Sequence, residues 1–257
     1  MSLLFSYLVD PAHWSGPTGI PVRIAEHLFY SVLALALGAV VAVPLGALIG
    51  HTHRGEFLVV GIANGMRALP ELGLLTLLVL LMGIDLVPVT LALAVLAVPP
   101  LLAGTYSGVR NVDAGTVDAA RGVGMREWQV LTKVEFPNAL PLVLGGLRAA
   151  SLQVIATAAV AAFVSFGGLG RLLIDGLKSL DYSQMAAGAI LVAALALAVE
   201  ALLAMIQRVV VSPGLRGGAR RSPLAEITGA DTALEPPAPE PVPAAPRPTT
   251  EPAGAEP

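Results

Sequence analysis

The sequence predicts an all-α integral membrane protein with about five transmembrane helices, and three observations support this fold class. Hydrophobic residues make up 55% of the 257 residues and charged residues 13%, about half the charged share of soluble domains. The mean hydropathy is +0.77. Most apolar residues lie in segments long enough to cross a hydrocarbon core of about 30 Å, and polar or turn-forming stretches separate these segments.

We expect membrane spans over residues 27–50, 57–83, 89–108, 139–163 and 185–211. Polar residues and a proline interrupt the second stretch, which we interpret as one broken span. Two short segments are the alternative, and they would raise the number of spans to six. The pair Pro99–Pro100 predicts a break in the third span, because each proline removes a backbone donor. The fourth span is rich in alanine and glycine, which permits close helix packing.

The chain divides into three expected regions. Residues 1–26 form an external, interfacial N-terminal segment, and residues 27–211 form the transmembrane domain, including a charged loop at 110–137. Residues 164–185 are expected to be a second, external loop with a tight glycine turn. Residues 212–257 are rich in proline and alanine and carry few large apolar side chains. We therefore expect a disordered tail there.

The distribution of basic residues predicts the orientation in the membrane. Arginine and lysine gather after the first span, around the 110–137 loop and after the last span. The positive-inside rule places such loops in the cytoplasm. The 110–137 loop and the C-terminus are therefore expected inside, and five spans place the N-terminus outside.

The 110–137 loop shows the signals of two short helices joined by a bend. Asp113 or Thr116 can cap a first helix, and Gly124 falls where a helix ends in a left-handed residue. A second helix would run through Trp128 and be closed by Pro137. Physical chemistry alone leaves two interpretations open: a compact element that docks on another protein, or an ordinary cytoplasmic loop with amphipathic helices.

A group of polar residues at membrane depth indicates a translocation path, because such residues are costly in lipid. Arg67 and Glu71 lie one helical turn apart and could pair. Pro70 leaves backbone carbonyls free for a neighbour or a substrate. Packing alone is the alternative for this pair, and hydrogen bonding between helices is the alternative for Gln153 with Thr157. The candidate path residues are Asn64, Arg67, Pro70, Glu71 and Gln153.

Several kinds of site have no support in the sequence. The chain has no cysteine, so disulfides and thiolate metal sites are excluded. Its four histidines are scattered, and the pair His51 and His53 is interpreted as a polar loop at the membrane edge; no metal site is predicted. No phosphate-binding glycine-lysine loop occurs. Net charge is −3, which gives no reason to expect nucleic acid.

The 110–137 loop also resembles the EAA signature of binding-protein-dependent ABC importer permeases. The spacing of the signature is intact, with aspartate for glutamate, valine for isoleucine and phenylalanine for leucine as mild departures. The matching residues are Asp118, Ala119, Ala120, Gly124, Val134, Phe136 and Pro137. The resemblance implies the type I ABC importer permease fold, with a cytoplasmic coupling helix that docks into an ATPase. The coupling residues would be Asp118, Ala119, Ala120, Gly124, Val134 and Pro137.

Further segments resemble the osmoprotectant branch of these permeases, which import glycine betaine, carnitine, choline or proline betaine. They are residues 13–31, 67–78, 105–125 and 134–173. The resemblance implies a multi-pass protein of the bacterial inner membrane that catalyses no covalent reaction and binds no cofactor. ATP and Mg would belong to separate ATPase subunits. A second permease subunit, identical or related, an extracytoplasmic substrate-binding protein and membrane lipid would be the other partners.

Other function classes remain open at the level of sequence. An ABC permease for another small solute, such as an amino acid or a sulfonate, would share the coupling loop. An ion-coupled secondary transporter would favour internal repeats with paired acidic sites at mid-membrane, and the sequence has no clear repeat. A purely structural membrane subunit would not need charges within its spans.

Overall fold

A computed structural model describes residues 7–164 and 166–211. The predicted tail at 212–257 lies outside the described residues. Within α3 (Glu56–Arg67), the side chains outside the described part are Leu58, Val60, Ile62, Asn64 and Arg67. Every regular element among the described residues is helical, as the sequence predicts.

Four helical runs in the described chain are long and apolar enough to cross a membrane: α2 (Ile20–Thr52), α5 (Leu86–Arg110), the run Glu127–Val164 and α10 (Tyr182–Val210). The run Glu127–Val164 consists of α7 (Glu127–Val130), a π-helix η2 (Leu131–Glu135), α8 (Phe136–Val160) and a 3₁₀ turn η3 (Ala161–Val164). The shorter elements are η1 (Pro11–Trp14), α3, α4 (Glu71–Met82), α6 (Ala114–Gly122) and α9 (Gly170–Ser179).

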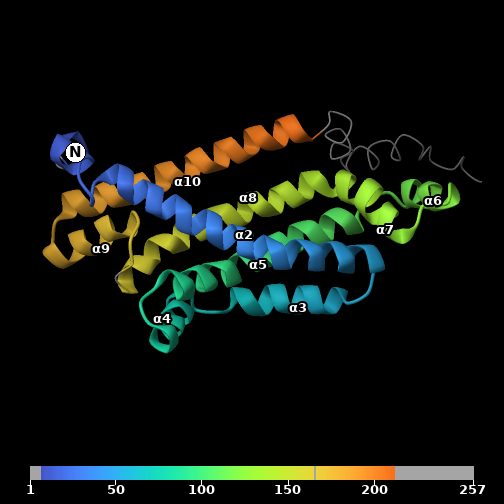
Figure 1. Cartoon of the computed structure of the whole chain (residues 1–257), viewed down its shortest axis with the longest axis horizontal. Helices are drawn as coiled ribbons and strands as arrows, with labels where there is room; N and C mark the ends of the chain where they lie inside the picture. The colour runs from blue at the N-terminus through green and yellow to red at the C-terminus, as the bar shows by residue number, and fades with distance from the viewer. Residues whose placement is uncertain (1–6, 165, 212–257) are drawn as a thin grey trace, which may run out of the picture. The chain divides into compact units, whose positions relative to one another are not determined.

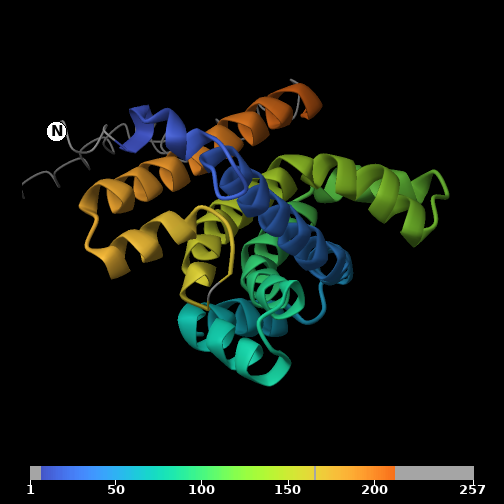
Figure 2. The same cartoon turned by 60° about the vertical axis from the view of Figure 1, so that its left-hand side comes forward.

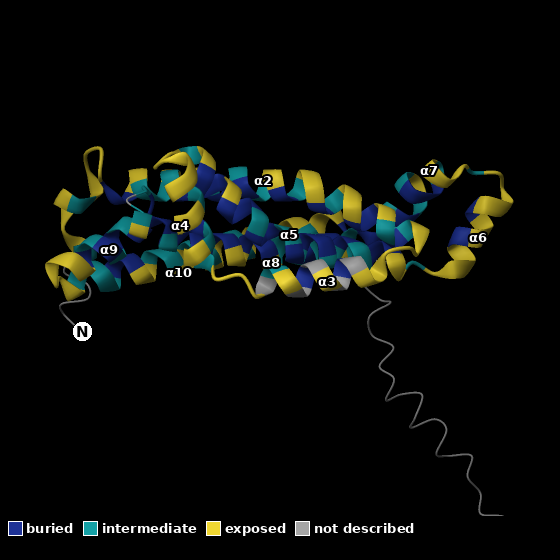
Figure 3. Ribbon diagram, turned by 90° about the horizontal axis from the view of Figure 1, so that it is seen from below, coloured by how far each residue is buried: buried dark blue, intermediate teal, exposed yellow. Residues whose placement is uncertain are grey.

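The core lies where α2, α5 and α8 pack along one another (Figures 1 and 3). Small residues permit this close packing. A Cβ atom built on Gly104 of α5 would lie only 2.7 Å from the Cα atom of Gly146 in α8. A Cβ on Gly46 of α2 would lie 2.9 Å from the Cβ of Thr105. The close packing predicted for the alanine- and glycine-rich fourth span is thus confirmed.

Helix α2 begins earlier than the predicted span, which was expected to start near His27. The extended Gly19 precedes the helix, and Pro21 lies in its first turn, where a missing N–H costs nothing. Arg23 and Glu26 form an ion pair of 3.0 Å. This pairing lets charged residues extend the apolar span at its N-terminal end, so residues 20–26 are helical and not a separate segment.

The second apolar stretch consists of two helices, each of 12 residues. One such helix is about 18 Å long, too short to cross alone. Both helices pack against α5; α3 also contacts α2, and α4 contacts η3 at the C-terminal end of α8. Helices α3 and α4 therefore follow one another from one end of the bundle toward the other, as the two halves of one broken span would. Pro70, extended at the start of α4, marks the break.

The predicted break in the third span is wrong. Helix α5 runs without interruption through Pro99 and Pro100. Helices α2 and α8 pack against α5 along its length, and neighbouring helices allow proline within a membrane helix. One chemical consequence remains. In a helix the carbonyl of Leu96 would accept a hydrogen bond from the N–H of residue 99 or 100. Both of these residues are prolines without an N–H, so this carbonyl lacks its usual helical partners.

The loop predicted at 164–185 contains a helix, α9, that the sequence reasoning missed. Gly168 adopts a left-handed backbone angle of +85° and makes the turn that precedes the helix. Leu172 and Ile174 are buried, and Arg171 pairs with Asp175 one turn along the same helix, with a nitrogen–oxygen distance of 2.9 Å. The helix has only 10 residues, and its apolar residues are interrupted by Arg171, Asp175 and Lys178, so a search for long apolar runs does not detect it.

Helix α10 packs beside α9 and against α8 (Figures 1 and 2). Its most apolar window has no residue buried within the described structure. Glu200 accepts hydrogen bonds from Arg148 of α8, with an Nε–Oε1 distance of 2.9 Å. Most of the apolar surface of α10 is therefore left for lipid or another protein.

Candidate functional site

The 110–137 loop lies at one end of the bundle, where α6 and α7 extend beyond α2 and α5 (Figure 1). Asp113 caps α6, because its Oδ2 accepts a hydrogen bond of 2.8 Å from the backbone N–H of Thr116. Of the two cap candidates, Asp113 is thus the cap and Thr116 the donor. A carboxylate cap at a helix N-terminus also interacts favourably with the helix dipole.

Gly124 makes the bend between α6 and α7, with a backbone φ of +85°, as predicted. No atom lies within 4 Å of a Cβ built on it, so the backbone angle and not space selects glycine there. The bend folds α6 onto the following turns, and Val117, Ala120 and Val130 form a small buried cluster. The loop is therefore a compact element with a small apolar cluster and not an extended connection.

The EAA residues are divided between the surface and the interior of this element. Ala120 is buried in the small cluster, whereas Ala119 is exposed. Of the two alanines, Ala119 is therefore the one on the surface of the element. Asp118 is exposed and lies 3.7 Å from Arg121. Val134 packs against the small cluster from the π-helix.

Pro137 does not close a helix, and this prediction is wrong. It lies in the first turn of α8, where proline is tolerated. The π-helix η2 joins α7 to α8, and its wider spacing lets the N–H of Phe136 donate to the carbonyl of Leu131. The loop thus continues directly into the membrane-spanning helix.

A polar network that sequence reasoning missed connects α2 to this loop. His51, in the last turn of α2, places Nδ1 at 2.5 Å from Oε2 of Glu135 in η2. Its Nε2 lies 3.2 Å from Oε2 of Glu127 in α7. Glu127 in turn accepts two hydrogen bonds, of 3.0 and 3.1 Å, from Arg121 of α6. The hydrogen bonds to Glu127 raise the pKa of the Arg121 guanidinium, so Arg121 stays charged.

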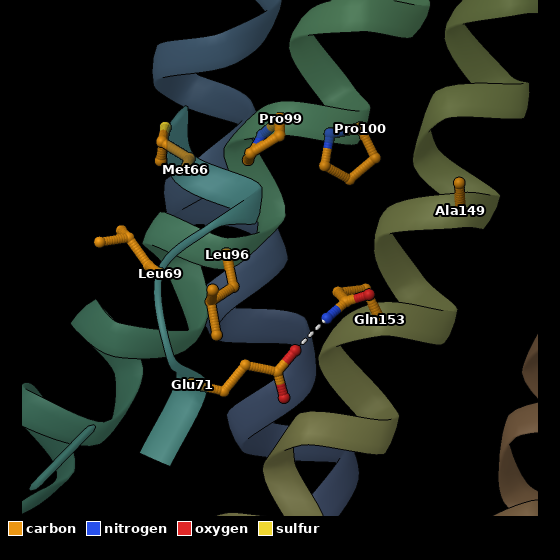
Figure 4. Close-up of a pocket in the computed structure, with 8 residues that line it drawn as sticks. All are labelled: Met66, Leu69, Glu71, Leu96, Pro99, Pro100, Ala149 and Gln153. Carbon is orange, nitrogen blue, oxygen red and sulfur yellow. Dashed lines mark hydrogen bonds between the residues drawn. The ribbon is translucent and has the colours of Figure 1, made fainter. Parts of the chain in front are cut away.

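Two of the five predicted path residues, Glu71 and Gln153, line a cavity of about 420 Å³ between α4, α5 and α8, whereas Pro70 is not among the lining residues (Figure 4). Glu71 of α4 and Gln153 of α8 point toward one another in this cavity, and Gln153 Nε2 donates to Glu71 Oε1 at 2.5 Å. Thr157 Oγ1 donates to Glu71 Oε2 at 3.0 Å. The lining residues are Met66, Leu69, Glu71, Leu96, Pro99, Pro100, Ala149 and Gln153.

Arg67 and Glu71 do not share one helix face as expected, because α3 ends at Arg67 and α4 begins at Glu71. The side chains of Asn64 and Arg67 lie outside the described residues. Glu71 instead bonds to Gln153 and Thr157 of α8. Hydrogen bonding between helices therefore describes Gln153, but the same side chain also lines the cavity.

The described lining of the cavity is mostly apolar, and Glu71 supplies the one carboxylate among the lining residues whose side chains the structure describes. Carboxylate oxygens attract positive charge.

Comparison with known proteins places this geometry in context. Residues 42–217 match the family described as binding-protein-dependent transport system inner membrane component. The chain is 34% identical to the glycine betaine/carnitine/choline transport system permease protein OpuCB of Bacillus subtilis (strain 168), over 76% of this chain and 90% of that protein. It is 34% identical to the osmoprotectant import permease protein OsmW of Salmonella typhimurium, over 74% of this chain and 91% of that protein.

Solved structures resemble the fold. A chain of the MetNI methionine ABC transporter in an inward-facing conformation superposes with a TM-score of 0.66 at 22% identity, covering 79% of this chain and 99% of that chain. A chain of an amino acid ABC transporter superposes with a TM-score of 0.56 at 20% identity. The fold is thus that of a type I ABC importer permease, as the resemblance of the 110–137 loop predicts.

Proposed function

Since the chain belongs to the family of binding-protein-dependent transport system inner membrane components, we propose that it is the permease subunit of an ATP-driven importer. The proposed solutes are osmoprotectants such as glycine betaine, carnitine, choline or proline betaine. That it is a multi-pass transport permease follows from the family and the apolar helices. One observation carries the choice of solute. Relatives that match across about three quarters of the chain are permeases named for glycine betaine, carnitine and choline.

The proposed partners are ATPase subunits, a substrate-binding protein and a second permease subunit, identical or related. Apolar side chains on the 110–137 loop support docking on an ATPase, since Val123 is 80% exposed and Trp128 72% exposed. ATP and Mg would be held by the ATPase, and this chain would contribute positioning and movement.

The proposed orientation places the 110–137 loop and the C-terminal end of α10 in the cytoplasm and the N-terminus outside. Arg121, Arg126 and Lys133 on the loop support it, because basic residues are retained on the cytoplasmic side. In this orientation the turn between α8 and α9 faces outward, toward a docked binding protein.

The proposed mechanism transmits movement of the ATPase through the loop. Nucleotide binding in the ATPase moves α6 and α7, and η2 passes this movement into α8, which carries Gln153 and Thr157. Glu71 would then lose or regain its partners as α4 and α8 separate, which opens or closes the cavity. Such a switch requires different contacts in its two states, and the Glu71 hydrogen bonds are contacts of this kind.

Uptake of radiolabelled glycine betaine in a strain that lacks this chain tests the function. We expect uptake to be lost, to return with the unmodified chain, and to stay absent with Gly124→Pro. Proline fixes φ near −65° and cannot adopt the +85° that the bend requires.

Gly122→Ala is the matched control. Gly122 ends α6 and has open space around its Cβ position, so uptake should stay near the unmodified level. Unchanged glycine betaine uptake in the strain that lacks the chain, with no other betaine importer active, contradicts the osmoprotectant assignment and leaves a permease for another small solute.

A further inference from the structure

We propose that His51 is a positioning residue that fastens the end of α2 to the 110–137 loop, so that α2 and α8 move together when the loop moves. This proposal rests on the proposed function, because it takes the loop as the element that an ATPase moves. None of the three residues in contact, His51, Glu127 and Glu135, is part of the EAA signature. The contact arises only where α2 meets the loop.

Geometry is the first argument. The His51 ring lies between two carboxylates from different elements, at 2.5 Å from Glu135 and 3.2 Å from Glu127. The side chains of His51 and Glu135 are 10% and 4% exposed, whereas that of Glu127 is 60% exposed. One ring therefore connects a buried group at the base of α8 with an exposed group on α7.

Hydrogen-bond chemistry is the second argument. A carboxylate only accepts hydrogen bonds, so the ring satisfies both glutamates only when both of its nitrogens carry hydrogen. Such a charged ring stabilises two negative groups at once and lies at the C-terminal end of α2, where the helix dipole favours positive charge. Without the ring, Glu135 would be a buried carboxylate without that partner, which is costly.

Continuity of the network is the third argument. Arg121 of α6 holds Glu127 by two parallel hydrogen bonds, an arrangement that resists rotation. A displacement of α6 is thus passed from Arg121 to Glu127, then to His51 and to Glu135. These residues connect α6, α7, η2 and α2 by side chains, in addition to the backbone that connects the loop to α8.

An apolar layer packs the same helix ends together independently of this network. Behind it, Ala47 of α2, Val109 of α5 and Leu131 of η2 belong to one buried cluster with residues of α8. That cluster holds the helix ends together by packing. Replacement of His51 should therefore leave the permease assembled and should change the transmission of movement.

The first experiment measures solute uptake per ATP hydrolysed, with the permease, its ATPase and its binding protein in proteoliposomes. We expect His51→Ala to lower this ratio roughly fivefold or more, the usual scale of coupling between sites. His51→Gln combined with Glu135→Gln should restore part of the ratio, because two amides can bond to each other without charge. His53→Asn is the matched control, because His53 is exposed with a left-handed φ of 55° that asparagine tolerates.

Two results of this experiment would overturn the proposal. One is an unchanged ratio in His51→Ala. The other is a parallel loss of uptake, ATP hydrolysis and assembled complex, which would assign His51 to folding alone.

A second experiment does not depend on the solute. Because the chain has no cysteine, spin labels can be placed at single introduced cysteines, Leu45→Cys on α2 and Ala114→Cys on α6, both exposed. We expect the distance between the labels to stay the same with and without ATP in the assembled importer. In His51→Ala the distribution of label distances should broaden, or the distance should differ between the ATP-bound and ATP-free importer. A distance that behaves identically in both proteins overturns the proposal, whereas a failed osmoprotectant assignment would appear only in uptake.

Discussion

At the residue scale, Glu71 is the side chain whose environment most directly suggests a role in transport. Its two carboxylate oxygens accept from Gln153 and Thr157, so it joins the broken span α3–α4 to α8 across the cavity. The acid is half-buried, and its partners come from a single helix. Relative movement of α4 and α8 must therefore break these hydrogen bonds or carry them along.

We expect Glu71→Ala to reduce uptake roughly tenfold, which corresponds to the loss of about 1.4 kcal/mol. The amount of protein inserted in the membrane should stay the same, because the apolar contacts of α4 remain. Uptake and immunoblotting of membranes measure the two quantities. Thr157→Val, which removes one of the two donors at nearly constant volume, should give a smaller reduction. Normal uptake by Glu71→Ala would remove this residue from the path.

At the element scale, the contact between α5 and α8 depends on two glycines. The Cβ position of Gly104 lies 2.7 Å from Gly146, and that of Gly146 lies 2.7 Å from the carbonyl of Pro100. Both distances are far below van der Waals contact, so no side chain fits without moving a helix. This close approach also brings the proline pair of α5 next to the helix that carries Gln153.

We expect Gly104→Leu to destabilise the permease by about 1–3 kcal/mol or more, because the added side chain overpacks the contact. The midpoint of thermal unfolding in detergent, followed by circular dichroism, measures the effect. Gly145→Ala is the control on the partner helix α8, next to Gly146, since nothing lies within 4 Å of its Cβ position. It should leave the midpoint unchanged or slightly higher, because alanine favours helix.

At the scale of the whole molecule, the attachment of α10 distinguishes it from the other long helices. Arg148 of α8 donates to Glu200 and to Gln207, the latter at 2.8 Å, and Gln207 donates to the carbonyl of Pro141 at 3.0 Å. Polar contacts therefore hold a helix whose apolar window is left uncovered. In a membrane such contacts fix the position of a helix where apolar surface alone gives no preference.

We expect Glu200→Ala to loosen α10 from α8, because it leaves the Arg148 guanidinium without its carboxylate partner. The free energy of unfolding should fall by about 1–2 kcal/mol. A spin label on α10 should also become more mobile. Glu200→Gln keeps one acceptor for Arg148, so its free energy of unfolding should lie between those of Glu200→Ala and the unmodified protein. An immobile label in Glu200→Ala would show that packing against α8 and α9 is sufficient.

The sequence by itself determined the membrane class, the positions of the long spans, the bend at Gly124 and the coupling-loop resemblance, and it narrowed the cap of α6 to Asp113 or Thr116. These features depend on composition and on residues that are close along the chain, where apolar length, capping and backbone preference act locally. The candidate cavity was partly predictable for the same reason, because Glu71 and Gln153 are conspicuous polar residues in apolar surroundings.

Only the tertiary structure decided which of these residues meet. Glu71 and Gln153 are 82 positions apart, and His51 and Glu135 are 84 apart, and nothing local in the sequence links either pair. The continuity of α5 through two prolines and of α8 past Pro137 was also decided there. Neighbouring helices and the first-turn position of Pro137 outweigh the local preference of proline to end a helix.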